Sequence, residues 1–328
     1  MRALVIGGTR FIGRHLVTEL LAHDYDVTIF NRGNHDNPFA DEPSVNHIQG
    51  DRKNESALEA AGADVDPDYV FDCVAYQPRD VRAATEIFAD VEGYVYISSG
   101  SSYGADYIPK REDETPLCEC TPEQALDDSI ESYGPRKAEG DRAVFAAGAD
   151  GINAMSVRPT VVYGPHDYTE RLDYWIHRVN EYDQVVVPGD GDLLWHRVYV
   201  EDVAAALRIV GESGEPGTAY NVGDRRLVTH TELIERIADA LGTEVEAVPA
   251  NERELTAGRL ECSDFPLYRA HPHVLSTNRL HSLGWESTSL RTAMERTVAD
   301  HLDSERDGLE IGPNREAEAK VLGVLETL

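Results

Sequence analysis

The segment Gly7-Gly8-Thr9-Arg10-Phe11-Ile12-Gly13 constrains the fold more than any other, because a strand-like pattern changes there into a helical one. The apolar run 3–6 precedes it, and apolar residues recur at helical spacing over 11–22. A second apolar run follows at 26–30. A strand, a glycine turn, a helix and another strand make a βαβ unit, which predicts a parallel sheet.

The alternation of strand and helix patterns continues along the first half of the chain. We predict strands over 45–49, 69–75, 93–98 and 153–158, and helices over 55–61, 80–88 and 132–147. This alternation is typical of α/β proteins with a doubly wound parallel sheet, the Rossmann fold. The polar stretch 104–128 interrupts it, and we expect this stretch to cross the rim of a ligand site.

Glycines at the first strand–helix turn let the backbone approach a pyrophosphate, and the helix N-terminus adds N–H donors and a positive dipole end. The motif therefore predicts a bound dinucleotide. The second strand ends in Asn31-Arg32 instead of the acidic residue that would bind the ribose 2′-hydroxyl of NAD. Arg10 and Arg32 are candidates for a clamp on the 2′-phosphate of NADP, so the sequence favours NADP and leaves NAD open. The other expected cofactor contacts are Gly7, Thr9, Phe11, Ile12, Gly13, Asn31, Asp51, Arg52, Val74, Ala75, Lys137 and Pro159.

Tyr133-Gly134-Pro135-Arg136-Lys137 places a tyrosine and a lysine four residues apart at the start of a predicted helix, on one helix face. The ammonium favours the phenolate and lowers a tyrosine pKa that is ordinarily near 10. Tyr133 can then exchange a proton with a substrate hydroxyl or carbonyl, and Lys137 can hold the nicotinamide ribose. In the serine-rich stretch 98–104, after a predicted strand, a serine can polarise the substrate oxygen.

Short elements separated by turns follow Tyr163 and predict a second, smaller part of mixed α/β structure. We predict a helix over 201–210, a strand over 219–222 and a capped helix over 229–241. We expect an NAD(P)-binding Rossmann domain over 1–164 to which about 192–214 returns, a substrate-binding part over 165–191 and 215–302, and an acidic, mostly helical tail over 303–328.

These motifs resemble the extended short-chain dehydrogenase/reductases, the group of NAD-dependent epimerases and dehydratases. The resemblance spans about residues 1–300 and rests on 7–13, Asp51, 98–104, Tyr133 with Lys137, 158–165, 188–191, 198–204 and 220–223. It implies Ser99 as the catalytic serine beside Tyr133 and Lys137. The segments 7–13 and 30–33 resemble a branch that includes the chloroplast stem-loop-binding proteins, which bind RNA.

The chain departs from the family pattern at the substrate side. Members that bind nucleotide sugars usually have asparagine at Val161 and arginine at Trp195, and both of those residues contact the diphosphate. Gly100-Ser101 stands where sugar-nucleotide 4,6-dehydratases carry an Asp-Glu pair, which argues against that chemistry. The residues that we expect to line the substrate site are Ser101, His166, Arg171, Trp195 and His196, which suit a sugar-like molecule.

The sequence thus predicts an NAD(P)-dependent oxidoreductase or epimerase acting on a hydroxyl or carbonyl of a sugar-like or nucleotide-sugar substrate. The alternative is a catalytically silent relative that senses NAD(P) or binds RNA. The complete set of Ser99, Tyr133 and Lys137 favours the enzyme. Relatives often dimerise through two helices, and the resemblance implies a homodimer through the helices that contain 80–88 and Tyr133.

The chain has 60 acidic against 30 basic residues, a net charge of −30. Such a charge disfavours binding to nucleic acid and to anionic membranes. Because the acidic residues are spread along the chain, we expect a halophilic protein adapted to concentrated salt, which screens self-repulsion. A strand pattern that begins at Arg2, and no apolar run of about 20 residues, predict a cytoplasmic location without a membrane span. The four cysteines indicate free thiols, and we expect no metal site.

Overall fold

The computed structural model describes residues 1–327 and divides them into two compact units. Unit 1 comprises 1–162, 198–223 and 275–287, and unit 2 comprises 163–197, 224–274 and the chain from 288. The chain therefore passes through unit 2 three times and returns to unit 1 twice.

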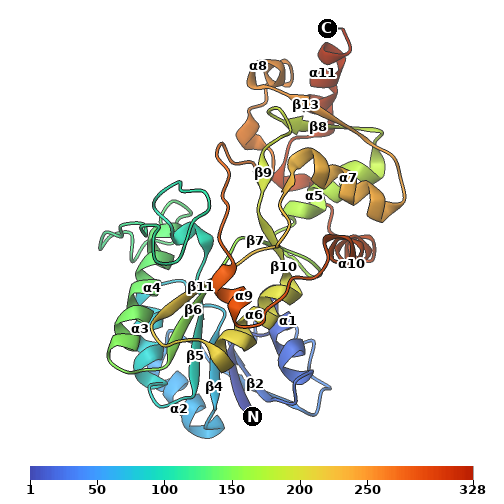
Figure 1. Cartoon of the computed structure of the whole chain (residues 1–328). Coiled ribbons are helices and arrows are strands. Elements are labelled where there is room, and N and C mark those ends of the chain that lie inside the picture. The colour runs from blue at the N-terminus through green and yellow to red at the C-terminus, as the bar shows by residue number, and fades with distance from the viewer. Residues whose placement is uncertain (328) are drawn as a thin grey trace. The chain divides into compact units, whose positions relative to one another are not determined.

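Unit 1 is built on a seven-stranded sheet with the order β11-β6-β5-β4-β1-β2-β3, in which all neighbouring strands are parallel. Its strands are β1 (Arg2–Ile6), β2 (Asp26–Asn31), β3 (Val45–Gln49), β4 (Tyr69–Asp72), β5 (Gly93–Ile97), β6 (Ala154–Pro159) and β11 (Thr218–Val222). Helices cover both faces, and the predicted doubly wound α/β fold is confirmed (Figure 1). Parallel strands that are buried on both faces explain why the strand patterns are apolar runs.

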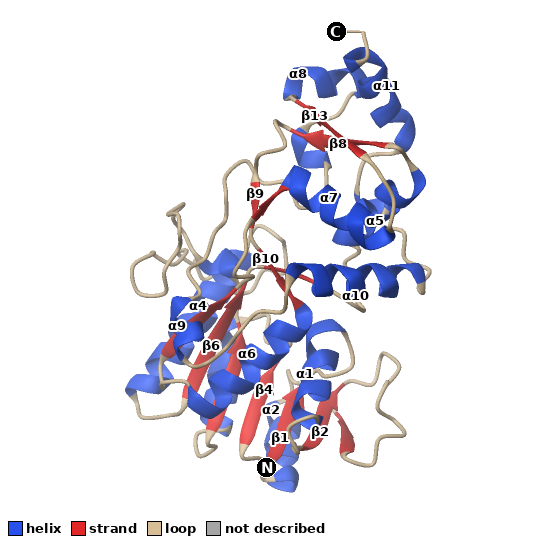
Figure 2. Cartoon of the chain, turned by 45° about the vertical axis from the view of Figure 1, so that its right-hand side comes forward, coloured by secondary structure: helices blue, strands red, loops and turns tan. Residues whose placement is uncertain are grey.

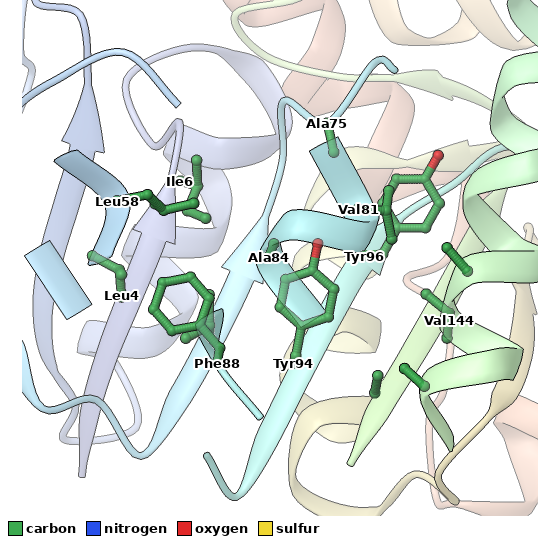
Figure 3. Close-up of a cluster of buried hydrophobic side chains, with 14 of the residues drawn as sticks. Leu4, Ile6, Leu58, Ala75, Val81, Ala84, Phe88, Tyr94, Tyr96 and Val144 are labelled. Carbon is green, nitrogen blue, oxygen red and sulfur yellow. The ribbon is translucent and has the colours of Figure 1, made fainter. Parts of the chain in front are cut away.

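The helices of unit 1 form two layers, with α2, α3 and α4 on one face of the sheet and α1 and α6 on the other (Figure 1). They are α1 (Phe11–Leu21), α2 (Glu55–Val65), α3 (Pro78–Ile87), α4 (Tyr133–Ala149), α6 (Val200–Ser213) and the short α9 (Asn278–Ser282). The α2–α4 face buries Leu58, Val81, Phe88 and Val144 against the sheet residues Leu4 and Tyr94 (Figure 3). Burial of each such side chain stabilises the fold by roughly 1.5–3 kcal/mol.

Strand β4 ends at Asp72, three residues before the predicted end of the strand at 75. The Asp72 carboxylate accepts a hydrogen bond from the Val74 backbone N–H (3.1 Å), and this contact turns the chain away from the sheet. The chain then enters α3 at Pro78, where proline is favoured because the first N–H of a helix has no intrahelical partner. The apolar residues 73–75 thus belong to a loop at the carboxyl end of the sheet.

Unit 2 is a smaller assembly of helices and short strands (Figure 2). Its elements are α5 (Arg171–Glu181), β8 (Gln184–Pro188), β9 (Leu194–Trp195), β12 (Val228–Thr229), α7 (His230–Leu241), β13 (Glu246–Ala250), α8 (Glu252–Leu255), α10 (Leu290–Leu302) and α11 (Arg315–Leu325). Strands β8 and β13 pair in parallel, and β9 and β12 pair antiparallel. Two further short strands, β7 (Val161–Tyr163) and β10 (Arg197–Tyr199), pair with each other.

The division into units differs from the predicted domain boundaries mainly in the two returns to unit 1. The first return to unit 1 extends to Gly223 instead of 214, because β11 pairs with β6 and completes the sheet. A second return, 275–287, was not predicted. It is held by a bridge between Leu275 and Lys110, and by the indole of Trp285, which donates to the Asp202 carbonyl (2.9 Å).

The predicted acidic tail is an integral part of unit 2. Helix α11 buries Val321 and Glu318, and the Glu318 carboxylate accepts from the Arg178 guanidinium (2.8 Å) and the Tyr174 hydroxyl (2.6 Å). Arg178 and Tyr174 both lie on α5, so the last helix, α11, is bonded to α5. No helix within residues 1–327 is long and apolar enough to cross a membrane, and these residues contain no cluster of metal-ligating side chains.

Candidate active site

The turn between β1 and α1 forms a close-packed backbone cradle. Gly7 and Gly8 adopt positive φ angles of 117° and 91°, which favour glycine. A Cβ atom on Gly13 would lie 2.6 Å from the backbone nitrogen of Gly8, so only glycine lets α1 pack this tightly on the turn. Among the described residues, no side chain caps the start of α1 and its first turn is free of acidic residues. This is the arrangement in which a helix N-terminus accepts a phosphate.

The end of β2 lies beside this cradle. The Asn31 side chain donates to the Gly7 carbonyl (3.2 Å) and accepts from the Gly33 N–H (2.8 Å), so its amide is used to fix the turn. Arg32 is exposed, and Arg10 is exposed with its guanidinium 3.3 Å from the imidazole Nε2 of His35. The structure thus leaves two exposed guanidinium groups on the loops that follow β1 and β2.

The two neighbours Asp51 and Arg52 have different environments. The Asp51 side chain is exposed, and its carboxylate accepts from the Lys53 backbone N–H (3.0 Å). Arg52 is buried, and its guanidinium contacts the carboxylates of Asp72 and Asp80. The side chain of Arg52 is therefore committed to a buried ion-pair network and leaves only its backbone available to a cofactor.

Lys137 lies in the second turn of α4, and its side chain is buried. Its buried ammonium donates to the backbone carbonyls of Ile97 (2.7 Å) and Ala75 (3.0 Å). Ile97 ends β5, and Ala75 lies in the loop after β4, so the lysine joins two strand ends at the carboxyl edge of the sheet. Its ammonium also lies 5.9 Å from the centroid of the Tyr133 ring and 4.8 Å from that of Tyr96.

Burial lowers the pKa of Lys137 to about 8, and the carboxylates of Asp72 and Asp141 oppose this shift. At neutral pH the ammonium is still the main form, but the pKa lies only about one unit above the pH. A lysine with this pKa beside a tyrosine is a typical arrangement for proton transfer near neutral pH.

Ser99 and Tyr133 lie on segments that pack against each other. The Ser99 hydroxyl accepts from the Ser101 N–H (3.1 Å) and caps a 3₁₀ turn over Gly100–Ser102. A Cβ atom on Gly134 would lie 2.5 Å from the Ser101 carbonyl oxygen, so the glycine after Tyr133 lets α4 approach this turn. Ser99, Ser101 and Tyr133 are all half-buried, so part of each side chain is accessible to a ligand.

The remaining predicted cofactor contacts also lie in unit 1. Thr9, Phe11 and Ile12 follow the glycine turn, Val74 precedes the carbonyl of Ala75, and Pro159 ends β6 opposite Val222 of β11. Phe11, the first residue of α1, has a positive φ of 29°, which is rare for a bulky residue. These positions lie at the carboxyl ends of strands, where doubly wound sheets bind ligands.

The predicted substrate residues are divided between the units, with Ser101 in unit 1 and the other four in unit 2. The His166 imidazole lies 3.3 Å from the Asp300 carboxylate, and the Arg171 guanidinium donates to the Thr169 hydroxyl (2.8 Å). Both side chains are half-buried and remain candidates for polar contact with a ligand.

Trp195 and His196 are packing residues in this structure. The Trp195 ring stacks on His230 with centroids 4.3 Å apart, and both rings pack against Trp175. The His196 imidazole lies 3.0 Å from the Asp224 carbonyl, and burial lowers its pKa to about 4. These contacts lie inside unit 2 and bury both side chains, and their role as substrate contacts stays a prediction.

Asp72 was not predicted to lie near the site, although its position at the end of an apolar strand pattern pointed to a buried carboxylate. An aspartate inside the apolar run Tyr69-Val70-Phe71-Asp72 is unusual, because a buried carboxylate needs a partner. That partner, Arg52, lies 20 residues earlier, and sequence spacing gave no reason to pair the two.

A family model of the NAD-dependent epimerase/dehydratase family matches residues 3–223. The chain belongs to this family. The match covers the glycine turn, Ser99, Tyr133 and Lys137, and the chain is accordingly an enzyme of the epimerase/dehydratase family, with an NAD-binding Rossmann domain.

Two sequence relatives and one solved structure illustrate the range of this epimerase/dehydratase family. The chain is 30% identical to the chloroplast stem-loop binding protein of 41 kDa b of Arabidopsis thaliana, over 87% of this chain and 75% of that protein. It is 26% identical to the low-salt glycan biosynthesis protein Agl12 of Haloferax volcanii, over 74% and 83%. The dTDP-glucose 4,6-dehydratase of Bacillus anthracis, solved in complex with NAD, superposes with a TM-score of 0.73 at 20% identity, over 93% of this chain and 97% of that one.

Proposed function

We propose that this protein is an NAD(P)-dependent oxidoreductase or epimerase that acts on a hydroxyl or carbonyl group of a sugar-like substrate. The observation that carries this proposal is the placement of Lys137 between the Ile97 and Ala75 carbonyls, with the half-buried Tyr133 on the same helix. Relatives named as acting on nucleotide sugars or glycans support the substrate class.

The residues present fit a dinucleotide. The turn at Gly7, Gly8 and Gly13 has no room for side chains, and an uncapped helix N-terminus follows it among the described residues. This cradle would hold the pyrophosphate, and Asp51 would bind the adenine amino group. Lys137 would hold the nicotinamide ribose. When bound, the nicotinamide supplies or accepts a hydride.

Residues of the chain would transfer the proton to or from the substrate oxygen. Lys137 favours the phenolate of Tyr133 and thereby makes this residue an acid/base at neutral pH. The Ser99 hydroxyl, which already accepts one hydrogen bond from the Ser101 N–H, would donate its own proton to the substrate oxygen. The turn at Gly100–Ser102 carries no carboxylate beside Ser99, which argues against the elimination chemistry of 4,6-dehydratases.

Replacing Tyr133 by phenylalanine tests this assignment. The variant keeps the ring that lies near Lys137 and removes only the hydroxyl. We expect turnover of a keto-sugar or nucleotide-sugar substrate to fall by about 10²–10⁴-fold, with the affinity for the dinucleotide unchanged. Unaltered turnover would refute the role of Tyr133.

We also propose a preference for NADP, which Arg10 and Arg32 support as two exposed guanidinium groups on the loops after β1 and β2. Asn31 supports it too, because this residue stands where an acidic side chain would bind the 2′-hydroxyl of NAD. Replacing both arginines by glutamine should weaken NADP binding and leave NAD binding unchanged. Arg291→Gln, at an exposed position of α10 in unit 2, is the matched control.

The relative named as a stem-loop binding protein is the one observation that favours a second function, binding to RNA. The net charge of −30 opposes it, because the charge repels the phosphate backbone at low salt. A gel-shift assay with structured RNA in concentrated KCl would decide, and a stable complex would favour the second function. The same charge, spread along the chain, supports a halophilic adaptation, under which thermal stability should rise with KCl concentration.

A further inference from the structure

Asp72 is a fully buried carboxylate at the end of β4, and each of its oxygen atoms has a partner. Oδ1 accepts from the Val74 backbone N–H (3.1 Å), and Oδ2 accepts from the Tyr94 hydroxyl (3.2 Å) and from the Arg52 guanidinium. The first contact shapes the loop that presents the Ala75 carbonyl to Lys137. Asp72 is therefore connected to the lysine through two residues of backbone.

A second carboxylate shares the same arginine. Asp80, in the first turn of α3, lies 3.3 Å from the Arg52 guanidinium, and its backbone carbonyl accepts from Arg52 Nη2 (3.0 Å). With all groups ionised, the two carboxylates and the buried guanidinium sum to a charge of −1, and Asp80 has a further, exposed partner, the Arg79 guanidinium (3.9 Å). Adding the ammonium of Lys137 brings the sum of the buried charges to zero. Buried charges persist when they are balanced in this way, because an unbalanced one is strongly disfavoured.

The other groups near Lys137 do not supply the negative charge that compensates its ammonium. Asp141, one turn along α4, is paired with the buried Arg158 (2.8 Å), so its charge is matched. The charge of Arg136 disfavours the ammonium, and burial raises the pKa of the Cys73 thiol, which keeps that group neutral. The ring centroids of Tyr76, Tyr96 and Tyr133 lie 4.8–5.9 Å from the ammonium, and these rings carry no negative charge to balance it.

We propose that Asp72 is a positioning residue for Lys137: its buried carboxylate fixes the loop that presents the Ala75 carbonyl, and it provides the negative charge that the ammonium faces. Of the charges around Lys137, Asp72 is the one that most strongly favours the protonated form. The network of Arg52, Asp72 and Asp80 thus acts on the reaction without contacting the substrate. This role rests on the proposed function only in so far as Lys137 is the active-site cation.

The chain contains only four lysines, Lys53, Lys110, Lys137 and Lys320, which makes a direct measurement practical. Lysine labelled with ¹³C at every carbon gives four Cε signals, whose chemical shifts follow the protonation of each ammonium. Lys137→Arg identifies the signal of Lys137 by its loss. In the wild-type protein we expect that signal to titrate with a midpoint near pH 8.

Asp72→Asn keeps the shape of the side chain and removes its charge. We expect it to lower the titration midpoint of Lys137 by at least about one pH unit, the usual effect of losing a facing charge. Asp80→Asn is the matched control, because it removes a carboxylate from the same arginine but not the contact to Val74. Its effect on the midpoint should be less than half as large.

The double variant Arg52→Gln/Asp72→Asn replaces the ion pair by two neutral amides, which avoids an unpaired buried guanidinium should the single variant fail to fold. We expect it to lower the midpoint as well. An unchanged midpoint in the folded variants, or an equal shift in Asp80→Asn, would overturn the proposal. The readout needs no substrate or cofactor, so failure of the proposed function, which shows as loss of dinucleotide binding, remains distinguishable.

Discussion

Lys137 in unit 1 and His230 in unit 2 are both buried titratable bases, yet their surroundings are opposite. The Lys137 ammonium donates to two carbonyls and faces the carboxylate of Asp72. His230 stacks on the ring of Trp195 and meets Trp175 edge-to-face, and neither of its ring nitrogens has a hydrogen-bond partner among the described residues. Burial lowers both pKa values, but to about 8 for Lys137 and to about 3 for His230.

The comparison shows that burial alone favours the neutral form of a base. Hydrogen-bond acceptors and a nearby negative charge favour its protonated form instead. The rule holds within unit 2 as well, where the buried Arg178 retains its charge beside the carboxylate of Glu318. Lys137 thus keeps the charge that the proposed chemistry requires, whereas His230 packs as a small aromatic ring. The predictions below test this distinction.

The largest expected contrast is between the variants Lys137→Met and His230→Phe. Lys137→Met should reduce turnover by at least about 100-fold, because it removes the charge that activates Tyr133. It should also lower the free energy of unfolding, since the buried Ile97 and Ala75 carbonyls lose their donor and the buried carboxylates lose a balancing charge. His230→Phe should leave turnover within twofold. Steady-state kinetics and denaturant unfolding measure both effects, and equal kinetic losses in the two variants would remove the distinction.

A smaller effect is expected when a facing charge is removed in unit 2. Glu318→Gln leaves the Arg178 guanidinium buried without its carboxylate and should cost about 3 kcal/mol of unfolding free energy. Lys320→Gln is the control, because its ion pair with Glu316 on the same helix is exposed and should matter by less than about 0.5 kcal/mol. Similar stabilities of the two variants would mean that α11 does not anchor unit 2.

A third expected effect concerns the pH dependence of stability. Because the pKa of His230 is about 3 in the folded protein and ordinarily near 6.5, only the unfolded chain takes up a proton as the pH falls below 6.5. Its contribution to stability is therefore present above pH 6.5 and lost progressively towards pH 3. His230→Phe should flatten the decline between pH 6.5 and 4, relative to wild type, by up to about 1.4 kcal/mol per pH unit. Parallel stability curves would contradict the low pKa.

The sequence predicted the first half of unit 1 closely, because alternating strands and helices leave local signals. The glycine turn, β1, α1 and β2 lie within one residue of their predicted bounds. The residues Ser99, Tyr133 and Lys137 could be proposed from motifs, since each motif follows a strand or opens a helix. Their roles remain predictions that the variants above test.

Features that depend on distant partners could not be predicted. The pairing of Arg52 with Asp72, the return of 275–287 to unit 1 and the anchoring of α11 by Arg178 and Glu318 each join segments 20 to 165 residues apart. Nor did composition distinguish a buried Trp195 from one that lines a site. Local patterns report which elements form, whereas burial depends on what they pack against.

The most direct test of the account is a calorimetric titration of the protein with NAD and with NADP in concentrated KCl. We predict binding of a dinucleotide, tighter for NADP, that weakens by at least about tenfold in Lys137→Met and is unchanged in Tyr133→Phe. Absence of binding to either dinucleotide by the folded wild-type protein would contradict the assignment of the cradle and of Lys137.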